Sequence, residues 1–166
     1  MNVLHRRCLP FGALLGVAVL VASNVLALST IDLVASGDWS VTVTASDLPS
    51  GAGSDLPDTD TSPADVALLT ISGTTGPGDS WQITVRMETA SWPSEMTLWL
   101  RRTGSGSGGS VSGGDGFQAL GTDDAAFLTG SDDVSEIPLQ LQVTGRSVWV
   151  PPGSYQATVT LTVVDL

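Results

Sequence analysis

One stretch of the sequence decides the fold: Tyr155-Gln156-Ala157-Thr158-Val159-Thr160-Leu161-Thr162-Val163. Apolar and polar side chains alternate along it without a break, and several of them are β-branched. A period of two residues places the apolar side chains on one face of an extended strand and the hydroxyl groups on the other. The stretch therefore predicts a half-buried antiparallel strand.

The same alternation recurs along the rest of the chain. It is clear in Trp39–Ala45, Trp81–Met87 and Ile137–Val143, and weaker in Thr30–Val34, Ala64–Ser72, Met96–Arg102 and Phe117–Leu120. No window of helical length repeats every 3.6 residues. Many short strands separated by Gly- and Pro-rich turns are typical of all-β folds. We predict an all-β fold with a single antiparallel β-sandwich of the immunoglobulin-like or Greek-key type, rather than a closed barrel with evenly spaced strands.

Two segments are low in complexity. The first, Gly104–Gly116, consists mostly of glycine and serine. This composition is typical of a flexible segment, and its neighbours are predicted strands, so we expect a long hairpin loop. The second, Pro49–Pro63, is rich in Asp, Gly, Ser and Thr, and we expect a loop there as well.

The beginning of the chain has the three parts of a secretory signal peptide. A basic start at His5 to Arg7 precedes an apolar stretch, Phe11–Ala22, and Val25–Ala27 offers small or aliphatic residues to a signal peptidase. We expect cleavage after Ala27, which gives a signal peptide at 1–27 and one β-sandwich domain at 28–166. The protein is then secreted, extracellular or bound to the cell surface through bacterial-type export, with no transmembrane segment after processing.

An uncleaved membrane anchor is the alternative to a signal peptide. Ser23 and Asn24 interrupt the apolar run and favour cleavage. Cys8 precedes the apolar stretch, whereas the cysteine of a lipoprotein follows it, so we expect no lipid attachment. Processing would also remove Cys8, which is the single cysteine, and His5, which is the single histidine.

The composition excludes several functions. The net charge is -11, and the chain contains no lysine, so binding to nucleic acid or to anionic lipid is not expected. Without a histidine or a thiol, the processed chain has no Ser-His-Asp triad and no cysteine nucleophile. Glu88, Glu95 and Glu136 are available for glycoside chemistry, but no motif marks a cleft. We predict that the protein is not an enzyme and needs no cofactor.

Acidic residues gather in the predicted loop at Asp55, Asp58 and Asp60. Calcium prefers clustered oxygen ligands on loops, so these residues are candidate calcium ligands. An acidic loop without metal is the alternative, because no EF-hand or calcium repeat is present.

Two tryptophans lie out of phase with the apolar residues around them. Met96, Leu98 and Leu100 take the inner face of their strand, so Trp99 and Arg101 face outward, and Trp149 lies between two valines. Outward aromatic residues on a sheet can stack on sugar rings or on a partner protein. We therefore consider Trp99, Arg101 and Trp149 as a candidate ligand or partner surface, with coverage by the protein's own loops as the alternative.

The ending Val150-Pro151-Pro152-Gly153-Ser154-Tyr155, followed by its Thr/Val strand, resembles the spore coat protein U-like group of secreted bacterial proteins. That group includes pilus subunits of archaic chaperone–usher systems. Gly37–Val43, followed by Asp47-Leu48, is similar to the WxL cell-wall-binding group. The resemblance implies a secreted β-sandwich. However, the processed chain lacks the cysteines frequent in the first group, and Leu161-Thr162-Val163 stands where a WxL protein has its closing Trp-x-Leu, so cell-wall binding is not carried over.

Resemblance to pilus subunits also implies an N-terminal strand that fills a groove in a neighbouring subunit. Leu28–Ala35 is the candidate donor or edge strand, with Ile31, Leu33 and Ala35 in phase. The alternative is that these residues form the first strand of their own domain. We expect a structural protein that assembles with itself or with other surface proteins, and as the alternative a monomeric module that binds carbohydrate or protein.

Overall fold

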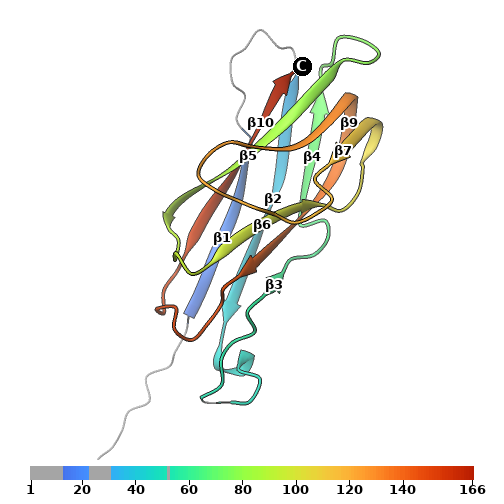
Figure 1. Cartoon of the computed structure of the whole chain (residues 1–166). Helices are drawn as coiled ribbons and strands as arrows, with labels where there is room; N and C mark the ends of the chain where they lie inside the picture. The colour runs from blue at the N-terminus through green and yellow to red at the C-terminus, as the bar shows by residue number, and fades with distance from the viewer. Residues whose placement is uncertain (1–12, 23–30, 52) are drawn as a thin grey trace, which may run out of the picture.

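The computed structural model describes residues 13–22, 31–51 and 53–166, with side chains from Ile31 onward except at position 90. The chain folds almost entirely into strands (Figure 1). In chain order the elements are β1 (Ala13–Ala22), β2 (Asp32–Val43), the short 3-10 helix η1 (Ala45–Asp47), β3 (Asp60–Thr61), β4 (Ala67–Ser72), β5 (Ser80–Ser91), β6 (Thr97–Arg102), β7 (Ser107–Gly113), β8 (Gln118–Ala119), β9 (Ala125–Thr144) and β10 (Gln156–Asp165). Among the described residues, no helix is long and apolar enough to cross a membrane.

Two long strands, β2 and β9, each contribute to both layers of the sandwich. One layer contains the second half of β2, then β1, β10, β5, the first half of β9, and β7. The other contains the first half of β2, then β4, the second half of β9, β6 and β8. All of these pairings except one are antiparallel. The prediction of an all-β antiparallel sandwich is confirmed.

The core lies between the two layers and is filled from alternate positions of the strands. On β10, Ala157, Val159 and Leu161 are buried, as their alternation predicts. Trp81 is fully buried and satisfies its indole N–H by donating to the backbone carbonyl of Asp132 at 2.9 Å. The other large side chains with no exposed surface are Leu69, Ile71, Ile83, Leu98, Leu100, Ile137, Leu139, Leu141 and Leu161.

The prediction of a long hairpin loop over Gly104–Gly116 is wrong in its central part, because β7 pairs there with β9. The glycines allow the two backbones to approach closely. A Cβ atom on Gly109 would lie 2.0 Å from the carbonyl oxygen of Ser131, and one on Gly108 would lie 2.4 Å from that of Asp133. The glycine content therefore reflects close strand packing in this segment as well as turn formation.

Two segments predicted as separate strands, Thr30–Val34 and Trp39–Ala45, contribute Asp32–Val34 and Trp39–Val43 to the single strand β2, and the second prediction is wrong at its end, because Ala45 begins η1. Gly37 joins the two parts with a φ of 135°, a conformation that side chains rarely allow. A Cβ atom there would also lie 2.3 Å from the carbonyl oxygen of Val66. Gly37 thus marks the point where β2 leaves β4 and begins to pair with β1.

Strand β9 extends well before the predicted Ile137–Val143. Its middle contains two non-glycine residues with left-handed backbone, Asp132 (φ 62°) and Glu136 (φ 57°). Such irregularities bend a strand and change the direction of its hydrogen bonds. They let β9 pair first with β5 and then with β4 and β6. The turn-like composition around Asp132 is the reason that the first half of this strand was not predicted.

Candidate functional site

Strand β1 occupies a central position in its layer, between β2 and β10 (Figure 1). It pairs antiparallel with Asp38–Val43 of β2 and parallel with Ala157–Leu161 of β10. The β1–β10 pairing is the only parallel one among the strands that the structure describes. We call the space between β2 and β10 the β1 slot.

The β1 slot is bordered by apolar side chains that face the core. Val43 on β2 and Val159 and Leu161 on β10 are buried, and Trp39 packs against the core. The slot is filled by Ala13–Ala22, which lies within the apolar stretch that the sequence assigns to a cleaved leader. A segment predicted to be removable is thus a central strand of the sheet.

The structure places the candidate donor residues within their own domain. Ile31 and Leu33 are buried, Leu33 is paired with Ile71 of β4, and Ala35 is half-buried opposite Leu69. Among the described strands, the first half of β2 pairs with β4 alone. It is therefore an edge segment with one hydrogen-bonded neighbour, whereas β1 has two.

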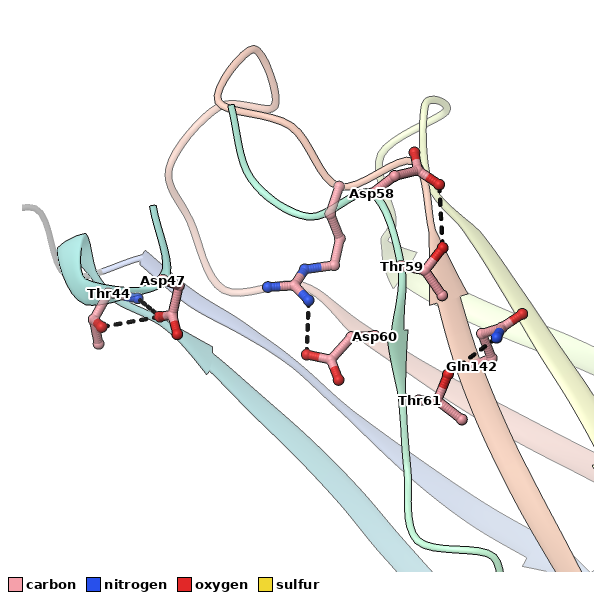
Figure 2. A network of polar contacts seen from close by, with 8 residues as sticks. Thr44, Asp47, Asp58, Thr59, Asp60, Thr61 and Gln142 are labelled. Carbon is pink, nitrogen blue, oxygen red and sulfur yellow. Dashed lines mark hydrogen bonds and ion pairs between the residues drawn. The ribbon is translucent and has the colours of Figure 1, made fainter. Parts of the chain in front are cut away.

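The three candidate calcium ligands contact the segment 145–148. The side chain of Asp58 accepts the backbone N–H of Gly145 at 3.2 Å. The side chain of Asp60 accepts an N–H of the Arg146 guanidinium at 2.7 Å. Figure 2 shows Asp58 and Asp60 with their side chains in different directions, so they do not converge on one point.

Asp55 makes the most contacts of the three. Its carboxylate accepts hydrogen bonds from the backbone N–H of Val148 at 2.9 Å, from that of Leu56 at 2.8 Å and from the hydroxyl of Ser147 at 3.0 Å. These donors favour the ionised form and lower the pKa of Asp55 below its ordinary value, with Val148 contributing most.

The acidic cluster therefore holds the loop that precedes β10. In the part of the chain that the structure describes, no three His, Cys, Asp or Glu side chains come close enough together to hold a metal ion. The donors bound to Asp55, Asp58 and Asp60 are protein groups instead.

Trp99 and Arg101 lie on the outward side of β6 and are both engaged by neighbours. The indole N–H of Trp99 donates to the hydroxyl of Thr144 at 2.9 Å, and the ring is half-buried. The Arg101 guanidinium stacks 4.5 Å from the ring centre of Phe117 and donates to Gln140 at 2.8 Å.

Trp149 differs from the other candidate residues because its side chain is 87% exposed. It lies on the loop that Asp55 holds, between Val148 and Val150, which line a surface pocket of about 290 Å³. The structure thus separates Trp149 from the pair on β6, which belongs to a different element.

Arg146 is a site residue that the sequence analysis missed. It is 7% exposed and lines a second, smaller cavity of about 40 Å³ next to the first. The surrounding sequence, Thr144-Gly145-Arg146-Ser147, gives no signal of burial. The carboxylate that pairs with it, Asp60, lies 86 positions earlier in the chain.

The chain matches no protein-family model and no curated protein sequence. The geometry of the β1 slot and of the loop before β10 therefore carries the functional argument.

Proposed function

We propose that this chain is an exported structural protein of the cell surface, whose processed domain is completed by a β-strand from another chain. One observation carries the proposal: the strand between β2 and β10 is formed by the apolar segment that the sequence assigns to a signal peptide. Removal of that segment would leave a gap in the middle of a sheet.

Such a gap is unfavourable for two reasons. The backbone N–H and C=O groups of β10 that face β1 would lose their partners, and unpaired strand edges readily recruit another strand. Val159 and Leu161, now buried, would become more exposed to water, which costs about 25 cal/mol for each Å² of apolar surface. An incoming apolar strand would satisfy both requirements, as in β-strand addition.

A second copy of the chain is the first candidate for the donor. The first half of β2 pairs on one side only, but the same residues placed in a β1 slot would pair on both sides. Ile31, Leu33 and Ala35 supply the alternating apolar positions that such a strand needs. The donated segment would separate from β4 up to Gly37, where β2 already changes its pairing partner.

The negative charge of the chain disfavours nucleic acid and anionic surfaces as partners. The chain carries a net charge of -11, and each arginine that the structure describes is engaged by another group. These pairings are Arg86 with Glu88, Arg101 with Gln140, Arg102 with the carbonyl of Gly113, and Arg146 with Asp60. Glu88, one of the carboxylates considered for glycoside chemistry, is held in an ion pair with Arg86.

A monomeric binding module is the second candidate function, and the exposure of Trp149 favours it. In that case β2 and β10, which run antiparallel to each other, would close the gap by pairing directly. No strand from outside would then be needed.

The test compares residues 28–166 with a variant that begins at Ser36, by size-exclusion chromatography with light scattering and by negative-stain electron microscopy. We expect the longer chain to form polymers and the truncated chain to form none. A stable monomer of the longer chain, with the amides of Ala157–Leu161 protected from hydrogen exchange, would contradict assembly and indicate direct β2–β10 pairing.

A further inference from the structure

A pocket lies at the end of the sandwich where η1 approaches the loop before β10. It consists of two adjoining cavities of about 290 and 40 Å³, which share Val43, Leu56, Ser147 and Val150 in their walls. The larger cavity is close to the lower end of the range for small-molecule sites, roughly 300–1,000 Å³.

The walls of the larger cavity are mainly apolar. They come from β2, from η1 and the segment after it, and from the loop before β10. The apolar side chains are Val43, Ala45, Leu48, Leu56, Val148, Val150 and Pro152. An aliphatic group would fit this lining better than a sugar, which needs several polar partners.

The loop that forms one wall is fixed in place. Asp55 binds Ser147 and Val148, and Asp60 binds Arg146. A wall held by these bonds needs little ordering when a ligand enters, which reduces the cost of binding.

Arg146 supplies a polar group that the protein itself leaves unpaired. One of its terminal nitrogens donates to Asp60, but its buried Nε has no hydrogen-bond partner among the described residues. A buried donor without a partner costs free energy, about 1–3 kcal/mol. The side chain also borders the smaller cavity, so a small shift of the guanidinium would bring the unsatisfied Nε–H to an acceptor atom held there.

The surrounding charge argues for a neutral ligand. The positive charge of Arg146 is already balanced by Asp60 at 2.7 Å. Hydrogen bonds from Thr44 lower the pKa of Asp47, and the positive charge of Arg146 lowers it further. An anion would thus meet net negative charge at this end of the molecule, and a cation would bring no acceptor for Nε.

We propose that this pocket binds a neutral, largely aliphatic molecule whose hydrogen-bond acceptor, such as a carbonyl oxygen, pairs with the Nε–H of Arg146. Trp149 lies between two of the wall residues, Val148 and Val150, and its own exposed side chain is outside the lining. The pocket shares only Val43 with the residues named for the β1 slot, so this inference goes beyond assembly through that slot.

The experiment titrates the full chain with octanamide, octanoate and octylammonium, which share the same aliphatic body. Tryptophan fluorescence reports changes in the loop that carries Trp149, and the Nε–H resonance of Arg146 in a ¹H–¹⁵N spectrum reports the polar contact. We expect octanamide to saturate and to shift the Nε–H resonance, and octanoate to bind roughly tenfold more weakly, a difference of about 1.4 kcal/mol. Octylammonium should leave the Nε–H resonance unchanged.

Two matched variants localise the binding. Ala45→Phe places a ring in the pocket wall from an exposed position and should abolish octanamide binding. Ala119→Phe makes the same change on β8, outside the pocket, and should leave binding intact. The proposal is overturned if octanamide fails to bind, if octanoate binds most tightly, if all three probes bind alike with the Nε–H resonance unmoved, or if both variants behave the same.

Discussion

The carboxylate of Asp55 accepts a hydrogen bond from the hydroxyl of Ser147 at 3.0 Å and another from the backbone N–H of Val148 at 2.9 Å. These groups are more than 90 residues apart in the chain. The contact joins the acidic loop to the loop before β10, and it fixes the wall of the pocket beside Trp149. A single side chain thus connects the two regions that the sequence analysis had considered separately, the acidic cluster and the exposed tryptophan.

Acidification should release this loop. The pKa of Asp55 is lowered below 3.8 in the folded protein, so ionised Asp55 stabilises the folded state at pH values above 3.8. That contribution is lost as the pH falls through the lowered folded-state pKa. We expect hydrogen exchange at the Val148 amide, after correction for intrinsic rates, to accelerate in this acid range.

In Asp55→Asn the same exchange should already be fast at neutral pH and should change less on acidification. The hydrogen bond from Thr74 lowers the pKa of Asp133 in the same way. Thr74 therefore serves as an internal comparison, and its amide should keep its acid response in the variant. An unchanged pH profile at Val148 would contradict the role assigned to Asp55.

The ion pair between Arg146 and Asp60 should contribute more to stability than an exposed pair. The Arg146 side chain is 6% exposed, and removal of its partner would leave a buried charge uncompensated. We expect Asp60→Ala to lower the free energy of unfolding by about 3 kcal/mol, measured by urea denaturation. The control is Glu88→Ala, which removes the partner of the more exposed Arg86 and should cost less than about 1 kcal/mol. Equal losses in the two variants would contradict the burial argument.

Gly130 should not tolerate a larger residue. A Cβ atom at this position would lie 2.3 Å from the ring of the buried Trp81 and 2.3 Å from the carbonyl oxygen of Ser110. We expect Gly130→Ala to destabilise the protein by about 2–3 kcal/mol in thermal or urea unfolding, because both neighbours must move. Gly121→Ala is the matched control, since a Cβ atom there would meet nothing within 4 Å. A neutral Gly130→Ala would mean that β7 and β9 are less closely packed than described.

A synthetic peptide of residues 11–24 should fill the β1 slot of residues 28–166. We expect the peptide to raise the melting temperature and to suppress polymers, because it restores pairing to β2 and β10. A peptide with Leu20→Pro lacks one backbone N–H in the centre of the stretch that pairs with β10 and should have a much weaker effect. Equal effects of the two peptides would show that binding does not use strand pairing.

Much of the strand content was predictable, because alternation depends on each segment alone. The buried positions of β10 and the inner face of β6, with Leu98 and Leu100, follow directly from a period of two residues. The candidate sites were harder to predict. Trp149 is exposed, as its position out of phase with the neighbouring valines predicts. Trp99 is out of phase with its apolar neighbours in the same way, but its indole N–H is bound by Thr144, which lies 45 residues away.

The errors also have a physical cause. Gly104–Gly116 has a loop-like composition, but pairing in β7 requires only backbone groups, which every non-proline residue provides. Three aspartates in one loop are compatible with calcium or with backbone donors. Which of the two these carboxylates bind depends on whether the fold brings backbone N–H groups from distant segments next to them, as it does here with Gly145 and Val148.

By itself, the sequence determined the strand class, the apolar faces, the acidic charge without lysine, and the leader-like pattern of residues 1–27. These are properties of composition and of spacing between near neighbours. Only the tertiary structure decided that Ala13–Ala22 lies between β2 and β10, that Ile31 and Leu33 pack in their own domain, and that Arg146 is buried against Asp60. Each of these depends on strand register and on contacts between distant segments. The physical reason is that backbone groups and apolar side chains at many positions are chemically equivalent and could pair with many others. The packing of the whole sandwich selects which of these pairs form.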